Sequence, residues 1–330
     1  MNSTSRASAE RGGNLAGRHY RNGFDLRITV YTAAKALLAA ALLAFLVKSV
    51  LIDTVRCDGT SMEPTILKGD RLFILRLGTL PFLRSLVAPP VDKVIAFRSP
   101  FQEKSIGLLR VAACGGDTIS IDSGRVISSR TLEHTRSFSE KLPDIVPAEF
   151  SPRDFFPWYR VPRKNDLLLI NRLSLRDFFF TSSIIRQEHP GQTVVISPVL
   201  LLDDSVCTSY TPSDFSLYSG ALDSVPDSLR YDWFFWDRLE EYLYRKHDTR
   251  KVSLYFSLQL DGVELSEYRV SDDYYFLLAD NRKSGFDSRY AGPVRADRCR
   301  GTARMVLWSF GSDEGKKRHF RFNRLGRFIQ

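Results

Sequence analysis

Residues 57–67 read CDGTSMEPTIL and place Ser61 in a short turn-forming segment directly after a hydrophobic stretch. A serine hydroxyl is a weak nucleophile until a base accepts its proton and nearby donors receive the oxyanion that forms. Gly59, two residues before the serine, lets the backbone approach a substrate carbonyl closely. The segment is therefore a candidate nucleophile loop, although Gly, Thr, Ser and Pro also make ordinary turns.

The preceding residues, 28–52, form an apolar span with an uninterrupted core at 36–47 between Lys35 and Lys48. About 20 apolar residues cross a bilayer, and lysines at the ends of a span can extend toward the headgroups. A cleavable signal peptide is the alternative interpretation. Lys48 and Asp53, in place of small residues, follow the core, which favours an uncleaved transmembrane anchor.

Residues 1–27 are rich in Ser, Gly, Asn and Arg and have no apolar periodicity, which predicts a disordered basic tail. Arginines outnumber acidic residues before the span. This asymmetry predicts a single-pass protein of the cell membrane, with a cytoplasmic N-terminus and the body outside the cytoplasm.

Beyond the anchor, short β-like runs alternate with Gly, Pro and Asp. The predicted strands are 71–76, 93–98, 108–113, 118–121, 166–170, 193–202, 252–260, 274–278 and 303–308. Residues 233–245 form the one longer helical pattern that we predict. We therefore expect a mainly β, antiparallel body, with a core in two parts (53–123 and 251–315) and an insertion or second lobe at 124–250.

The chain has 330 residues, of which 43% are hydrophobic and 26% charged, and these are globular values. Its net charge of +9 predicts an anionic partner. Cations alternate with aromatic and aliphatic residues in the tail 316–330, a composition that suits an anionic membrane surface or single-stranded nucleic acid. Because the body is expected outside the cytoplasm, we predict membrane lipids as the partner and no nucleic acid.

Four cysteines lie far apart without a C-x-x-C pair: Cys57, Cys114, Cys207 and Cys299. This spacing argues against a zinc site or a redox dithiol. Free thiols and disulfides both remain possible if the body is extracytoplasmic.

Four blocks resemble the type I signal peptidases, membrane-bound serine endopeptidases that remove signal peptides from exported preproteins. The blocks are 59–65 with Gly69 and Asp70, 92–98, 110–119, and 280–292. The resemblance implies exported preproteins as partners, bound as an added β-strand with small side chains in two pockets before the cut. It implies no metal and no organic cofactor.

The resemblance also implies roles for individual residues. Ser61 corresponds to the nucleophile, and its N–H with the Gly59–Thr60 segment corresponds to the oxyanion hole. Four charged residues of the last block would brace the site through charge-assisted hydrogen bonds: Asp280, Arg282, Asp287 and Arg289. A surface ion-pair cluster is the alternative for these four.

The chain departs from the family pattern at the general base. Leu109 stands where the family has a lysine that accepts the serine proton, and leucine has no lone pair. Gly285 stands where the family commonly has a serine that hydrogen-bonds this lysine. The milder exchanges are Ala113, Gly115 and Ala279.

No other residue is an obvious replacement base. Lys104 is five residues from Leu109, so in an extended strand it would lie about 17 Å away on the opposite face. Arg110 stays protonated. Lys93, Lys283, His134 and His189 are the remaining candidates. We predict a signal peptidase-like serine endopeptidase with its general base unassigned, and the alternative is an inactive relative that binds signal peptides or a membrane protein.

Overall fold

The structure, a computed structural model, describes residues 26–77, 91–100, 105–129, 152–207, 210–247, 249–311 and 319–329. The predicted basic tail therefore lies outside the described residues, apart from its last two. Helix α1 (Leu26–Leu51) contains a stretch, Val30–Leu51, that is long and apolar enough to cross a membrane. Its 22 residues extend about 33 Å, against a hydrocarbon core of about 30 Å. The predicted apolar span is thus a helix with exposed leucines, as a lipid-facing helix requires.

The body, residues 49–330, is built mainly of antiparallel strands. Its strands are β1 (Ile52–Arg56), β2 (Asp70–Leu75), β3 (Val94–Arg98), β4 (Ile106–Cys114), β5 (Thr118–Asp122), β6 (Arg125–Ser128), β7 (Phe156–Arg160), β8 (Leu167–Leu169), β9 (Val194–Leu202), β10 (Ser205–Cys207), β11 (Val252–Leu260), β12 (Val263–Glu264), β13 (Glu267–Arg269), β14 (Tyr274–Leu278), β15 (Val294–Arg295), β16 (Cys299–Gly311) and β17 (His319–Phe320). Its helices are α2 (Leu175–Glu188), α3 (Asp227–Arg230), α4 (Trp233–Lys246) and α5 (Ser288–Ala291), with short 3-10 turns that include Pro152–Asp154 and Ala296–Arg298.

The largest sheet has the strand order β1-β2-β16-β3-β4-β14-β15, with β17 paired to β16. Strand β2 alternates buried and half-buried residues because one of its faces covers the core. Val94–Phe97 of β3 are all buried, since this strand lies inside the sheet. The 13-residue β16 pairs with both β2 and β3 through irregular registers that bend it. The predicted mainly β, antiparallel fold is confirmed.

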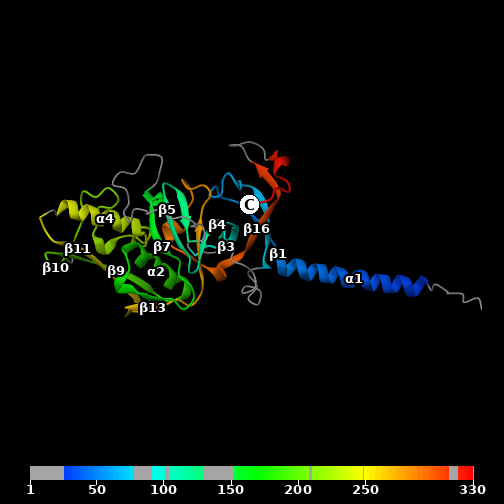
Figure 1. Cartoon of the computed structure of the whole chain (residues 1–330), viewed down its shortest axis with the longest axis horizontal. Helices are drawn as coiled ribbons and strands as arrows, with labels where there is room; N and C mark the ends of the chain where they lie inside the picture. The colour runs from blue at the N-terminus through cyan, green and yellow to red at the C-terminus, as the bar shows by residue number, and fades with distance from the viewer. Residues whose placement is uncertain are drawn as a thin grey trace, which may run out of the picture. The chain divides into compact units, whose positions relative to one another are not determined.

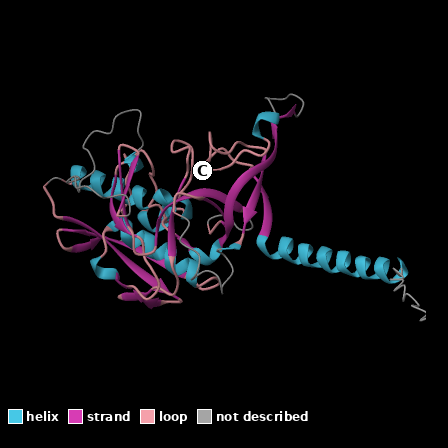
Figure 2. Ribbon diagram, turned by 45° about the vertical axis from the view of Figure 1, so that its right-hand side comes forward, coloured by secondary structure: helices cyan, strands magenta, loops and turns pink. Residues whose placement is uncertain are grey.

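The lobe between the two core segments contains helices that pack with the sheet β10-β9-β11-β12 (Figure 2). Helix α4 agrees with the predicted helical pattern, whereas α2 was not predicted. The sequence nevertheless marks the start of α2 with an N-cap residue. The Ser174 hydroxyl accepts a hydrogen bond from the Asp177 N–H at 3.2 Å. Nine of its 14 residues are buried, so packing within the lobe fixes this helix.

The lobe shares a hydrophobic core with the first core segment. Strand β6, beyond residue 124, pairs with β5, and β7 pairs with the other edge of β5. The lobe also packs on the second core segment: the ring centroid of Phe156 in β7 lies 5.4 Å from that of Phe276 in β14. Within the body, the lobe elements β9 and α4 lie at one end and β1 and β16 at the other (Figure 1).

Candidate functional site

Ser61 lies in the turn that joins β1 to β2. Backbone hydrogen bonds between Cys57 and Asp70, and between Gly69 and Cys57, both at 2.8 Å, close the neck of this turn. Gly69 has φ +94°, and a Cβ there would lie 1.9 Å from the Phe310 carbonyl oxygen, so glycine is required. Met62, next to the serine, is 1% exposed and anchors the turn in the core. The turn is therefore rigid on either side of Ser61.

A cavity of about 800 Å³ opens beside this serine. The turn, strands β3 and β4 and the 284–286 segment line it: Cys57, Asp58, Gly59, Thr60, Ser61, Met62, Phe97, Ser99, Ser105, Ile106, Gly107, Leu108, Leu109, Ser284 and Phe286. All three residues expected at the nucleophile and oxyanion positions thus share one cavity. We refer to it as the serine cavity.

Leu109 of β4 lines the serine cavity and is 5% exposed. Its main chain pairs with Ile95 of β3, so its position in the sheet is fixed by register. The family pattern that the sequence resembles has a proton-accepting lysine at this position, and a leucine has no lone pair to accept a proton. The exchange of the family's lysine for Leu109 therefore lies in the wall of the serine cavity.

Cys57 and Asp58 are the described lining residues with a thiol or carboxyl group. Burial raises the pKa of the Cys57 thiol to about 11, and its Sγ donates to the Gly59 carbonyl oxygen at 3.3 Å. The thiol is therefore protonated near neutral pH and is a poor base. Asp58 is exposed and pairs with Arg56 at 3.1 Å. Among the described lining residues there is neither lysine nor histidine.

The other candidate bases lie elsewhere. Lys93 lines a different cavity with Arg110 and Arg327. Lys283 is exposed, and His189 at the end of α2 contacts the Tyr268 hydroxyl at 3.1 Å. Lys104 and His134 fall outside the described residues. Lys93, Lys283 and His189 are therefore not among the residues that line the serine cavity.

Gly285 and Ala279 are sterically coupled. A Cβ added at Gly285 would lie 3.5 Å from the Ser61 Cβ, but only 2.1 Å from the Ala279 Cβ and 2.9 Å from the Asn281 carbonyl oxygen. The Ala279 methyl group is fully buried and occupies that space. The two exchanges noted in the sequence are therefore complementary, a relation that sequence spacing alone did not reveal.

The Asp280–Asn281 segment holds the serine turn in place. Asp280 accepts two hydrogen bonds from Arg110, at 2.8 and 2.7 Å. Burial opposes ionisation of Asp280, but hydrogen bonds from Arg110 and Thr65 outweigh it and lower its pKa. Asn281 donates from its backbone N–H to the Ser61 carbonyl oxygen at 2.9 Å and from Nδ2 to the Thr60 carbonyl oxygen at 3.2 Å. Asn281 thus positions the turn, a role that we did not predict.

A cluster of buried charged side chains also supports this segment, through contacts with Ala279. Asp287 accepts hydrogen bonds from the Ala279 N–H at 3.0 Å and from the Arg289 side chain at 2.9 Å. Burial alone would lower the pKa of Arg289, but Asp287 and Asp154 raise it. Burial lowers the pKa of Arg282, which donates to the Ala279 carbonyl oxygen at 2.7 Å.

Asp154 is the member of this cluster that sequence reasoning missed. It comes from the lobe and pairs with the Arg289 guanidinium at 2.6 Å, where the Arg289 side chain is 0% exposed. No local pattern around residue 154 indicates this contact, because its partner lies 135 residues away. The lobe therefore contributes a negative charge that pairs with a buried arginine of the 280–292 block.

A family model described as "Signal peptidase, peptidase S26" matches residues 30–143 and 231–308, more than half of the chain. The chain belongs to the signal peptidase S26 family. Among curated proteins, none matches it. The S26 match covers the serine turn, Leu109 and the 280–292 block, and it leaves residues 144–230 of the lobe outside. In the described part of this S26 chain, no group of three His, Cys, Asp or Glu side chains is placed to hold a metal.

Proposed function

We propose that this S26 chain binds the signal peptides of exported preproteins in the serine cavity, at the membrane surface. One observation carries the proposal: the cavity beside Ser61 keeps the turn and its supporting contacts, while its wall contains the buried Leu109, which stands where the family pattern has a lysine. Binding needs the cleft and its backbone donors, whereas turnover also needs a proton acceptor. In this proposal the shape of the serine cavity is maintained by four charged residues: Asp280, Arg282, Asp287 and Arg289.

The proposal includes a membrane-anchored topology. Helix α1 would span the cell membrane, with the arginine-rich N-terminus in the cytoplasm and the body outside it. A body tethered in this way meets signal peptides while their apolar segments are still in the bilayer. Membrane anchoring is supported by the length and apolar composition of Val30–Leu51.

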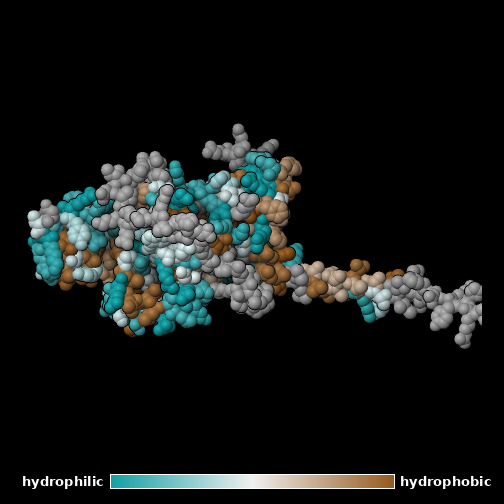
Figure 3. Space-filling model, viewed as in Figure 1, coloured by the Kyte–Doolittle hydropathy of each residue, from teal (hydrophilic) through white to brown (hydrophobic). Residues whose placement is uncertain are grey.

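The body itself would rest on the lipid surface at the end that carries β1 and β16. Large apolar side chains are exposed there and in the C-terminal segment: Trp308, Phe310, Phe322, Leu325 and Phe328. Apolar surface is visible at this end of the body (Figure 3). Cations accompany these rings, and the Arg71 guanidinium lies 5.8 Å from the Trp308 ring centroid. Aromatic rings with adjacent cations suit the interface of an anionic bilayer. Residues 316–318 and 330 of the predicted surface tail lie outside the described residues.

Cleavage is the second candidate function, with Ser61 as nucleophile and the N–H groups of the Gly59–Ser61 segment as the oxyanion hole. The retained serine in a rigid turn favours it, since a binding protein has no need of a hydroxyl there. A replacement base would have to come from a side chain outside the described lining of the cavity.

The test uses the detergent-solubilised full-length chain and a purified preprotein. We expect binding of the preprotein by wild type and by Ser61→Ala with equal affinity, and no cleavage by either. Mass analysis of the products detects cleavage directly. A cut after a small residue that disappears in Ser61→Ala would establish the second candidate, and absence of binding by either form would refute the first.

A further inference from the structure

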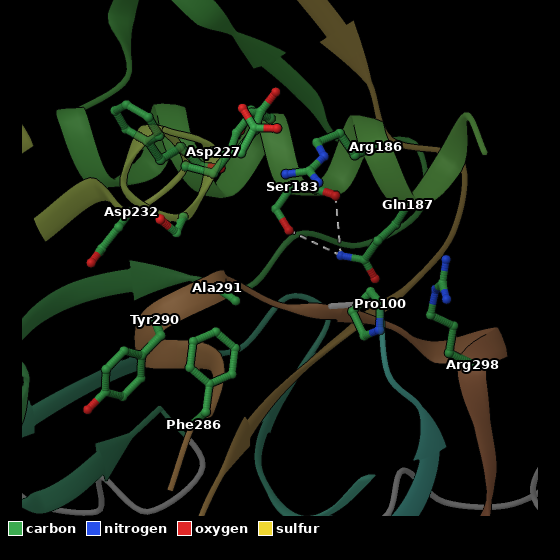
Figure 4. A pocket seen from close by; sticks show the side chains of 14 residues that line it. Pro100, Ser183, Arg186, Gln187, Asp227, Asp232, Phe286, Tyr290, Ala291 and Arg298 are labelled. Carbon is green, nitrogen blue, oxygen red and sulfur yellow. Dashed lines mark hydrogen bonds between the residues drawn. The ribbon is translucent and has the colours of Figure 1, made fainter. Parts of the chain in front are cut away.

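A second cavity, of about 490 Å³, lies between the lobe and the 286–291 segment. Ser183, Arg186 and Gln187 of α2 form one wall, and the rings of Phe286 and Tyr290 stand opposite them (Figure 4). Asp232 and Arg298 lie at the two ends. We refer to this space as the lobe cavity. All of α2 falls in residues 144–230, which the S26 model does not match, so this wall is particular to the lobe.

The lobe cavity adjoins the serine cavity. The Phe286 side chain, 56% exposed, lines both. Ser99 lines the serine cavity and the next residue, Pro100, lines the lobe cavity. Phe286 also follows Gly285, whose added Cβ would lie 3.5 Å from the Ser61 Cβ. A polypeptide lying at Ser61 therefore reaches the lobe cavity within a few residues, at about 3.4 Å per extended residue.

The polar groups on the α2 wall are mostly satisfied within the protein. Gln187 donates to the Pro293 carbonyl oxygen at 2.9 Å and accepts from the Arg295 N–H at 3.0 Å. The carboxylate of Asp232 is neutralised by Arg153 at 2.7 Å. These groups shape the cavity but are not available to a ligand.

The unpaired charge in the lobe cavity is mainly positive. Arg186 packs over the Tyr231 ring at 4.1 Å, and neither it nor Arg298 forms an ion pair within the described part of the chain. Asp227 is exposed and offsets one of these two charges. A guanidinium presents a planar pair of donors that matches a carboxylate, and nearby rings add contact area for the neighbouring side chains.

We propose that the lobe cavity receives the mature part of a preprotein, just beyond the cleavage position, and selects an acidic side chain there through Arg186 and Arg298. This inference rests on the proposed function. The direction is inferred from the body and the chain order: within the body, β1 and the lobe lie at opposite ends (Figure 1), and β1 is the first strand after α1 in the sequence. The apolar segment of a preprotein stays near the bilayer, so the segment that runs toward the lobe is the mature one.

The test measures binding of fluorescein-labelled peptides to full-length Ser61→Ala chain in detergent by fluorescence anisotropy. Each peptide carries a small-residue A-x-A site and ten following residues, with one Asp moved through the first eight positions. Peptides with Asn at the same position are the reference. We expect the Asp peptide to bind about 3- to 10-fold more tightly at one position or two neighbouring positions.

Arg186→Gln and Arg298→Gln should each reduce this preference, and the double variant should abolish it. Arg186→Lys should retain part of it. Arg172→Gln is the matched control, because Arg172 is exposed and does not line the cavity. This control removes one positive charge without touching the site. Thermal unfolding of each variant verifies that the fold is intact.

The outcomes separate the two proposals. Binding with no preference for Asp at any position, or a preference that survives in the double variant, overturns this inference and leaves the proposed function standing. If none of the peptides binds while a purified preprotein does, only this inference is overturned; if the preprotein does not bind either, both are overturned. An equal loss in Arg172→Gln would show a general charge effect and would also overturn the inference.

Discussion

Restoring a proton acceptor beside Ser61 requires three substitutions. Leu109→Lys supplies the base at a wall position that is 5% exposed. Gly285→Ser supplies its hydrogen-bonding partner, but the new Cβ would lie 2.1 Å from the Ala279 Cβ. Overpacking of this kind costs about 1–3 kcal/mol, so Ala279→Gly must accompany it. The Asn281 carbonyl oxygen, 2.9 Å from the new Cβ, still has to move by a few tenths of an ångström.

The introduced lysine also has a calculable cost. If burial lowers its pKa by about 3, about half of it is neutral near pH 7.4, and the free energy of unfolding falls by about 4 kcal/mol at that pH. Such a lysine binds its proton more readily in the unfolded chain. The variant should therefore lose stability as the pH falls from about 10 to about 7 and lose little more below that.

A positioned general base contributes about 10²- to 10⁴-fold to rate. We expect the triple variant to cleave a preprotein at least 100-fold faster than wild type, measured by gel densitometry and product mass. Ser61→Ala in the triple background is the control. A folded triple variant that binds preprotein and gains no activity would refute our placement of Leu109 at the base position. Equal activity without Ala279→Gly would refute the steric coupling.

Three further predictions concern the braces and the lipid surface. Asp154→Asn should lower the free energy of unfolding by about 3 kcal/mol in urea denaturation, because Arg289 stays buried with one carboxylate fewer; a loss below about 1 kcal/mol would contradict the buried cluster. Asp280, whose pKa is lowered by Arg110, stabilises the fold above about pH 5 and loses this effect as the pH falls through its lowered pKa. The stability difference between wild type and Asp280→Asn should therefore shrink in acid, and a constant difference from pH 3 to pH 7 would argue against the pair. In vesicles with brominated acyl chains, tryptophan fluorescence should be quenched, and Trp308→Phe should remove most of the quenching; unchanged quenching would place this face away from lipid.

Each of the nine predicted strands overlaps a strand of the structure, because apolar runs and alternation are local properties, whereas eight further strands were not predicted: β1, β6, β7, β10, β12, β13, β15 and β17. The α2 helix was missed because its run of Phe178, Phe179 and Phe180, followed by Thr181, has the composition of a strand. Burial within the lobe decides in favour of the helix. Ser174 with Asp177 three residues later is the capping pattern that could have identified its start.

At the site, resemblance identified the positions but not their contacts. Ser61, Leu109 and Gly285 are far apart in sequence, and only the fold shows that Leu109 lines the cavity beside Ser61. The exchange at Ala279 was taken as mild, whereas its methyl group fills the space that a side chain at 285 would need. The pairing of Asp154 with Arg289 depends on a long-range approach of two segments, which no local pattern encodes.

The Arg289 guanidinium pairs with Asp287 and with Asp154 of the lobe, so it resists separation of the lobe from the core. The Trp233 indole N–H also donates to the Arg289 carbonyl oxygen, at 2.9 Å, so two lobe segments depend on one residue. Peeling the lobe away would leave a buried cation with a single counter-charge, so partial opening is costly. Lobe and core should therefore act as one cooperative unit in native-state hydrogen exchange, and a shortened chain without the lobe should not retain an ordered 279–289 segment.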